Sequence, residues 1–243
     1  MGKKNLNYDA LRQASIKAQK EKEKKQKRNL IIAIAIPVAI ALIAAVIIII
    51  SSANKETYVP LAQVQEEINA YSAADFEVSD KESKYIIIKV KNYGDIVCEL
   101  REDIAPITVK NIKKLVSEKF YDGLIFHRVI EDFMIQGGGI TQSYTQKESP
   151  AIKGEFSSNG VKNDLLHYRG VLSMARTSVK NSASSQFFIM HQTSPHLDGD
   201  YAAFGYVLAG MEVVDKVATV KTNGNDMPLE DVIIESIRFA NKK

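Results

Sequence analysis

The residues from Phe126 to Gly138 (FHRVIEDFMIQGG) have the clearest chemical potential in this chain. Arg128 precedes the bulky apolar pair Phe133 and Met134, and Gln136 follows that pair. A guanidinium stays charged at every accessible pH and presents its N–H groups as a planar fork. A charged donor beside apolar side chains is suited to stabilising a polar transition state by hydrogen bonding. This chemistry requires no nucleophile, general base or metal ion.

Four further segments follow in a fixed order: LSMAR at 172–176, SQFFI at 185–189, PHLDG at 195–199 and YAAFG at 201–205. Any single phenylalanine among them is more typical of an ordinary core residue, and a lone arginine is more typical of the surface. Taken together and in order, the segments resemble the signature of the cyclophilin-type peptidyl-prolyl cis/trans isomerases. The resemblance extends over residues 85–239.

The reaction that this resemblance implies is rotation about an X–Pro bond. The uncatalysed barrier is about 18–20 kcal/mol, because the amide loses its resonance when it is twisted. In the twisted state the proline nitrogen regains its lone pair. A catalyst therefore needs an apolar slot for the pyrrolidine ring and a donor that binds the twisted amide better than the planar one.

By resemblance, Arg128 is the catalytic residue. The substrate-binding positions that the resemblance implies form a proline pocket and an adjoining peptide groove: Phe133, Met134, Gln136, Ala175, Arg176, Gln186, Phe188, His196, Leu197 and Tyr201. Gln136 matches the family glutamine that bonds the substrate backbone beside the arginine. Neither a cofactor nor a metal ion is implied.

Three positions depart from the eukaryotic pattern and resemble the bacterial branch. His196 stands where eukaryotic members carry tryptophan, Arg176 where they carry asparagine, and Tyr201 where they carry histidine. An imidazole offers less apolar area than an indole. The sequence therefore predicts weak binding of cyclosporin-type inhibitors together with retained turnover of proline peptides.

Charge is unevenly distributed along the 243 residues. Residues 1–29 hold ten basic and three acidic side chains, a net charge of +7, so the remainder carries −4 of the total +3. A mildly acidic domain argues against nucleic-acid binding. The four histidines lack metal-ligand spacing, and the lone Cys98 excludes an intramolecular disulfide. Cys98 is expected on a half-buried strand.

Residues 30–50 are uninterruptedly apolar. A helix of this length, at about 1.5 Å per residue, spans a hydrocarbon core of about 30 Å. The basic residues before it predict a cytoplasmic tail (1–29), a single-pass anchor in the cell membrane (30–50) and an extracytoplasmic domain. A cleaved signal peptide is the alternative, although the apolar run exceeds the usual length of about 7–15 residues.

The remaining chain divides into a stalk or linker over 51–84, with a short helix near 61–71, and an isomerase-like domain over 85–243. The pattern predicts a β-hairpin at 85–100, a helix from 105 to about 119, a short helix at 211–217 and a final strand at 232–239. The fold class expected from the resemblance is mainly β: a closed antiparallel eight-stranded barrel with two capping helices, preceded by one transmembrane helix.

Two functions remain open from the sequence. The first is an isomerase that assists the folding of proline-containing polypeptide clients outside the membrane. The second is a non-catalytic chaperone or scaffold module that holds proline segments. The presence of Arg128 with its apolar neighbours favours the isomerase, since a binder has no need of the arginine. Oligomeric state is not predicted.

Overall fold

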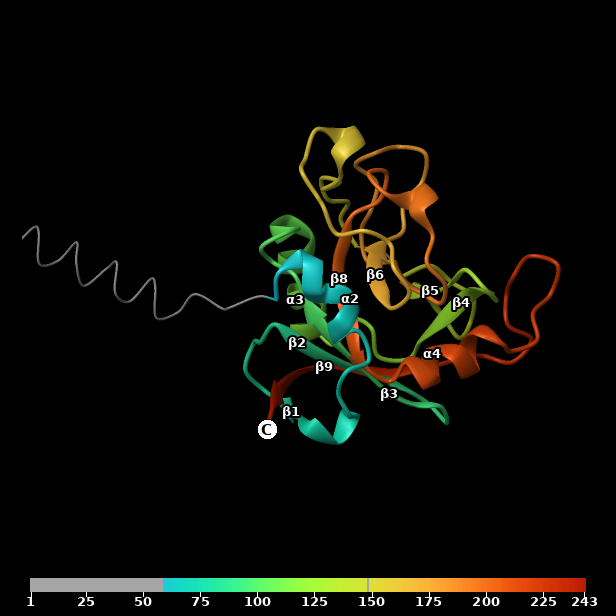
Figure 1. Cartoon of the computed structure of the whole chain (residues 1–243). Helices are drawn as coiled ribbons and strands as arrows, with labels where there is room; N and C mark the ends of the chain where they lie inside the picture. The colour runs from blue at the N-terminus through green and yellow to red at the C-terminus, as the bar shows by residue number, and fades with distance from the viewer. Residues whose placement is uncertain (1–58, 148) are drawn as a thin grey trace, which may run out of the picture. The chain divides into compact units, whose positions relative to one another are not determined.

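The computed structural model describes residues 59–147 and 149–243 (Figure 1). The predicted tail over 1–29, the predicted membrane helix over 30–50 and the first part of the predicted linker lie outside these residues. Within the described ranges, no helix has the length and apolar character that crossing a membrane requires. The described residues belong to one compact unit.

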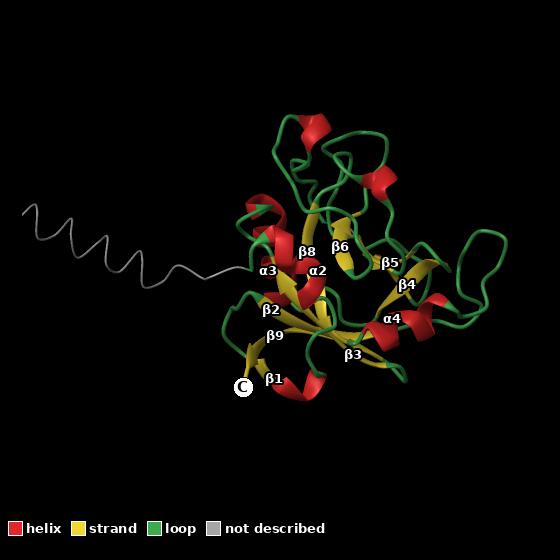
Figure 2. Ribbon diagram, viewed as in Figure 1, coloured by secondary structure: helices red, strands yellow, loops and turns green. Residues whose placement is uncertain are grey.

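Strands outnumber helices in this unit (Figure 2). The strands are β1 (Phe76–Ser79), β2 (Tyr85–Val90), β3 (Gly94–Leu100), β4 (Leu124–Ile130), β5 (Met134–Thr141), β6 (Val171–Met174), β7 (Phe187–Met190), β8 (Ala203–Ala209) and β9 (Ile234–Lys242). The α-helices are α2 (Val64–Glu67), α3 (Pro106–Ser117) and α4 (Met211–Ala218), and the 3-10 helices are η1 (Leu61–Gln63), η2 (Ala73–Asp75), η3 (Ser157–Asn159) and η4 (Pro195–Leu197).

The described strands form one nine-stranded antiparallel sheet with the order β1-β9-β2-β3-β8-β6-β7-β5-β4. The prediction of mainly β structure is confirmed, whereas the prediction of eight strands in a closed barrel is wrong. Closure needs a continuous ladder between the end strands. Here one edge of β9 pairs with β1. Strand β4 meets the segment before β9 at the isolated bridge Ile125↔Ile233, so the ladder between the ends of the sheet is not continuous.

Apolar side chains on the sheet alternate between its two faces and form two separate clusters. Ile86 and Ile88 on β2 belong to the larger cluster, which α3 and α4 cover, while Ile87 belongs to the smaller cluster on the opposite face. Successive strand residues point to opposite faces, so this segregation follows directly from the sequence. The smaller cluster also contains Met134 and Phe188, and it therefore connects the sheet to the pocket described below.

Helix α3 has the amphipathic face that the sequence predicts. Its apolar positions Val109, Ile112, Leu115 and Val116 are all buried. The helix begins with proline at its first position, where the missing N–H costs nothing. From a distant loop, the carboxylate of Glu155 accepts hydrogen bonds from the N–H of Ile107 at 3.0 Å and of Thr108 at 2.7 Å. An anion at a helix N-terminus also complements the helix dipole.

The predicted hairpin, the two predicted helices and the final strand correspond to β2–β3, α3, α4 and β9. Cys98, expected to be half-buried, is fully buried on β3. Burial raises the pKa of its thiol, which keeps the sulfur protonated and unreactive.

Residues 59–84, predicted as part of a stalk or linker, instead pack on the sheet. Val64 is fully buried and Phe76 is 4% exposed. The backbone N–H groups of Asn69 and Tyr71 donate to carbonyls of β8 at 3.1 Å. The short helix predicted near 61–71 corresponds to η1 and α2, but no local pattern indicated that this segment and β1 reach the core.

Candidate functional site

A surface cavity of about 330 Å³ lies beside β4, β5 and β7. This volume falls within the range of small-ligand pockets, roughly 300–1,000 Å³. Ten side chains line it, all of them predicted from the sequence: Arg128, Phe133, Met134, Gln136, Ala175, Arg176, Phe188, His196, Leu197 and Tyr201. Gln186, the remaining predicted residue, is not among these lining residues but accepts a hydrogen bond from Gln136.

Buried apolar side chains form the floor of the pocket. Met134, Phe188 and Leu197 are 2%, 5% and 7% exposed. Strands β5 and β7 pair with Gln136 opposite Phe188, so that the register itself sets a polar and an apolar lining residue side by side. Leu197 comes from η4, which begins at Pro195. Such a floor suits an apolar ring and provides it with no hydrogen-bonding group.

Arg128 reaches the pocket through an irregularity in the β4–β5 ladder. Phe126 pairs with Gly137 and Arg128 pairs with Gln136, which leaves His127 as an extra residue on β4. A β-bulge of this kind redirects side chains and is common beside active sites. Phe126 is fully buried, whereas His127 and Arg128 are only partly buried. The bulge thus brings both polar side chains beside Gln136.

The Arg128 guanidinium has a carboxylate partner. Its Nε donates to Asp226 Oδ2 at 3.3 Å, and both side chains are 43% exposed. Asp226 lies on the loop after α4, drawn in red at the right-hand side of Figure 1. Among the described residues, no other protein group hydrogen-bonds the guanidinium, so its terminal N–H groups are free to meet a ligand.

Two neighbours fix the side-chain amide of Gln136. Its Nε2 donates to Gln186 Oε1 at 3.0 Å and lies 3.5 Å from His127 Nε2. Burial, together with the positive charge of Arg128, lowers the pKa of His127, so this imidazole is neutral at pH 7 and can accept from the amide. Both amide hydrogens are then engaged, and the amide oxygen remains available as an acceptor.

Glycines on β5 make room for this arrangement. A Cβ on Gly139 would lie 2.4 Å from Gln186 Cγ, which is far inside van der Waals contact. Gly138 has φ +85°, a conformation that side chains strongly disfavour. Gln186 therefore lies directly against the β5 backbone.

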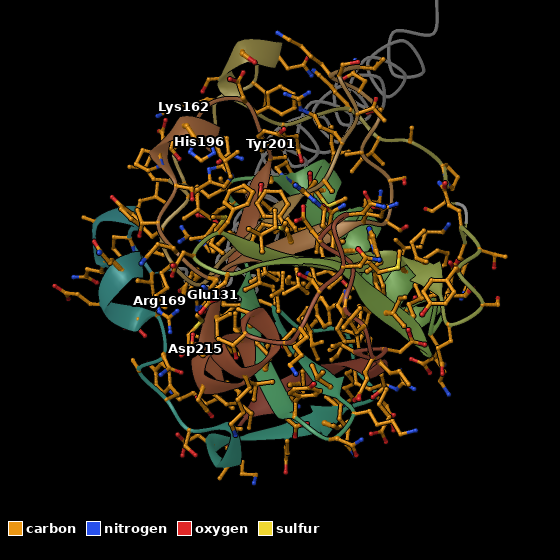
Figure 3. All side chains as sticks on the ribbon, turned by 90° about the vertical axis from the view of Figure 1, so that its right-hand side faces the viewer. Glu131, Lys162, Arg169, His196, Tyr201 and Asp215 are labelled. Atoms are coloured by element: carbon orange, nitrogen blue, oxygen red, sulfur yellow. The ribbon has the colours of Figure 1, made fainter. Side chains whose placement is uncertain are left out.

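Aromatic contacts form the rim of the pocket. His196 stacks on Phe133 with ring centroids 5.7 Å apart. The Arg176 guanidinium lies 4.6 Å from the centre of the Tyr201 ring, and its Nε donates to the carbonyl of Asp200 at 2.9 Å. Figure 3 shows His196 and Tyr201 on the same side of the molecule. These residues define the mouth of the cavity.

A buried histidine supports the pocket from behind. The ring of His167 stacks on that of Phe188, with the two ring centroids 6.1 Å apart. The His167 Nδ1 atom lies 2.9 Å from Asp198 Oδ1, and its Nε2 atom lies 3.0 Å from Ser173 Oγ. Burial lowers the pKa of His167. A serine, a histidine and a carboxylate in this order resemble a hydrolytic triad. Ser173 is fully buried, however, so no substrate reaches its hydroxyl and the role is structural.

A second ionic cluster anchors the turn that carries Phe133. His191 Nδ1 accepts from the Asp132 N–H at 2.9 Å, and its Nε2 lies 3.3 Å from Asp215 on α4. Arg169 also pairs with Asp215, at 2.7 Å (Figure 3). In residues 59–147 and 149–243, no group of three His, Cys, Asp or Glu side chains is placed to hold a metal ion.

Sequence reasoning missed Asp226 and the supporting role of His167. The letters Asn223-Gly224-Asn225-Asp226 signal a turn, but nothing in them indicates contact with residue 128. The spacing of His167 relative to the other three histidines indicates no role for it. Its neighbours Ser173 and Asp198 become visible only once the strands are paired.

Comparisons with known proteins agree with this geometry. The family model described as "Cyclophilin type peptidyl-prolyl cis-trans isomerase/CLD" matches residues 85–239. Peptidyl-prolyl cis-trans isomerase B of Escherichia coli is 45% identical over 60% of this chain and 94% of that protein. A peptidyl-prolyl cis-trans isomerase of Acinetobacter baylyi is 46% identical over 61% of this chain and 81% of that protein.

A solved structure also matches. The crystal structure of a cyclophilin type peptidyl-prolyl cis-trans isomerase of Cryptosporidium parvum, in the presence of the dipeptide Ala-Pro, superposes with a TM-score of 0.55 at 30% identity. The match covers 64% of this chain and 98% of that chain.

Proposed function

The chain belongs to the cyclophilin-type peptidyl-prolyl cis/trans isomerases, and we propose that it isomerises X–Pro bonds at the pocket beside Arg128. The observation that carries this assignment of the site is the convergence of a charged donor and a buried apolar floor on one cavity. That cavity has the size of a proline side chain with its flanking backbone. The crystal structure of the Cryptosporidium relative was obtained in the presence of the dipeptide Ala-Pro, which contains the X–Pro bond expected in a substrate.

In the proposed mechanism the pyrrolidine ring rests on Met134, Phe188 and Leu197. The terminal N–H groups of Arg128 donate to the proline nitrogen as its lone pair forms in the twisted amide. This interaction is absent in the planar ground state, so it lowers the barrier rather than only tightening binding. The Gln136 amide oxygen accepts from a substrate backbone N–H and holds the chain while the bond rotates.

A protease-coupled assay with an Ala-Pro peptide tests the activity. The full chain, purified with detergent, should accelerate cis-to-trans conversion in proportion to enzyme concentration. Binding of the same peptide without acceleration would favour the alternative function, a module that only holds proline segments. The isomerase is favoured because the apolar floor alone would suffice for a holder.

We also propose a location and a branch for the protein. The apolar run over 30–50, preceded by the +7 segment, supports an anchor in the cell membrane with the isomerase domain outside, acting on emerging clients. His196, Arg176 and Tyr201 support the bacterial branch. Protease added to intact spheroplasts should digest the domain and spare the tail. Protection until lysis would contradict this topology, and a mature N-terminus near Asn54 would indicate a cleaved signal.

A further inference from the structure

The loop between α4 and β9 is attached to β4 at the position of the arginine. The Asp226 carboxylate accepts from Arg128 Nε at 3.3 Å, and the Asp226 carbonyl accepts from the N–H of the next residue, Val129, at 2.8 Å. One loop residue therefore contacts two consecutive residues of β4, once through its side chain and once through its backbone. The carboxylate is thereby placed relative to the backbone that carries Arg128.

The loop also holds itself in a defined shape. Asn223 Oδ1 accepts from the N–H of Asn225 at 2.9 Å and of Met227 at 3.2 Å, and the Asn223 N–H donates to the Met227 carbonyl at 2.8 Å. Asp226 has φ +63°, in the left-handed region that aspartate tolerates better than most residues. The position of the carboxylate is thus determined by a hydrogen-bonded turn.

The contact uses Nε, the guanidinium nitrogen nearest the side-chain stem. Nε lies between the side-chain stem and the fork, so a bond there fixes the plane of the fork and leaves both terminal nitrogens for substrate. An ion pair whose partners are each 43% exposed contributes little to stability. Its consequence therefore lies in the orientation of the arginine.

We propose that Asp226 is a positioning residue that orients the Arg128 guanidinium toward the proline nitrogen. This inference rests on the proposed function of Arg128 and adds a residue outside the sequence motifs that identify the site. Arginine has many rotamers and is half exposed here, so without the carboxylate the fork would spend less time in the productive orientation. The loss should appear in kcat, since orientation matters for the twisted amide more than for ground-state binding.

The test compares Asp226→Ala and Asp226→Asn with wild type in the full chain. Asp226→Ala should lower kcat/KM about five- to tenfold, mostly through kcat, because the lost contact acts in the transition state. Asp226→Asn keeps an acceptor oxygen and should lose about twofold, within the range expected for an exposed ion pair. Asp231→Asn is the matched control: Asp231 lies on the same loop and accepts from the Tyr144 hydroxyl at 2.8 Å, whereas the carboxylate that pairs with Arg128 is that of Asp226, so this variant should leave kcat unchanged.

A double-mutant cycle separates positioning from general damage to the fold. In an Arg128→Ala background, Asp226→Ala should cause no further loss of turnover, because the residue acts through the missing guanidinium. An equal loss in both backgrounds, or unchanged kcat in Asp226→Ala, would overturn the proposal while leaving the isomerase assignment intact. If wild type itself were inactive, the proposed function would fail.

The contact also has a readout that does not depend on turnover. In wild type, the Arg128 Nε–H should give a 15N-resolved resonance that exchanges slowly with water, and this resonance should broaden or disappear in Asp226→Ala. An equally protected resonance in both proteins would contradict the proposed orientation of the guanidinium.

Discussion

The floor of the pocket and its polar side are held by different kinds of contact. The floor residues Met134, Phe188 and Leu197 are buried, and the first two are fixed by the β5–β7 pairing. On the polar side, Arg128 and Gln136 are partly exposed and depend on side-chain partners for their orientation. The difference suggests a division of labour in which the floor determines affinity for the proline ring and the polar side determines the rate of rotation.

The largest effect is expected at Arg128. Arg128→Ala should lower kcat/KM by about one to two decades, which corresponds to roughly 1.4–2.8 kcal/mol of transition-state stabilisation. Arg128→Lys should be impaired too, since a point charge lacks the planar fork and the Nε donor. Turnover is measured by the protease-coupled assay, and circular dichroism checks the fold. Near-wild-type turnover in either variant would contradict the proposed role of Arg128 in stabilising the twisted amide.

The rim offers the next test, because His196 stands between floor and solvent. His196→Trp should strengthen binding of a cyclosporin-type macrocycle by about 1–2 kcal/mol, through added apolar contact and an indole N–H donor. Isothermal titration calorimetry measures the affinity. Nanomolar binding by the unmodified protein, or no gain on introducing tryptophan, would show that this position does not control inhibitor affinity.

A smaller effect is expected at the floor. Phe188→Leu should raise KM about fivefold, from about 1 kcal/mol of lost apolar contact, with kcat nearly unchanged. Phe187→Leu is the matched control, because Phe187 precedes Phe188 on β7 but faces the main core, against Tyr121 and Phe126. That variant should lose stability in urea without a change in KM. A fall in kcat alone for Phe188→Leu would contradict the division of labour.

The smallest effect concerns pH. Burial lowers the pKa of both His127 and His167 in the folded protein. As pH falls below the ordinary histidine pKa of about 6.5, these two histidines become protonated in the unfolded chain but stay neutral in the folded protein. The free energy of unfolding therefore decreases. Above that pH neither histidine contributes. Urea unfolding between pH 7.5 and 5.5 should show this loss, and His167→Asn should make it shallower. A free energy independent of pH would refute the predicted protonation states.

The sequence predicted both the floor residues and the polar residues of the pocket. It could do so because short motifs contain these residues, and neighbouring strands bring the motifs together. Contacts made by loops were not recovered. Asp226 lies on a turn, and its contact with Arg128 joins residues far apart in the sequence. The residues of this turn determine its local conformation, but they do not indicate which strand it contacts.

The prediction of a closed eight-stranded barrel failed for a related reason, because β1 adds a ninth strand at one end of the sheet. Phe76 begins β1 inside the stretch predicted as a stalk or linker, and β1 then occupies an edge of β9. A four-residue strand has too few positions for a period-two pattern to stand out. Its pairing depends on a partner near the far end of the chain, which no local pattern indicates.

Exchange NMR of an Ala-Pro peptide in the presence of the full chain tests the division of labour most directly, because one titration gives both Kd and the rate of cis–trans exchange. Arg128→Ala should keep Kd within about threefold of wild type while catalysed exchange falls at least about tenfold. Phe188→Leu should weaken Kd while the bound peptide still exchanges at nearly the wild-type rate. If both variants lost affinity and exchange in the same proportion, the floor and the polar side would not have separate roles, which would contradict the proposed division of labour.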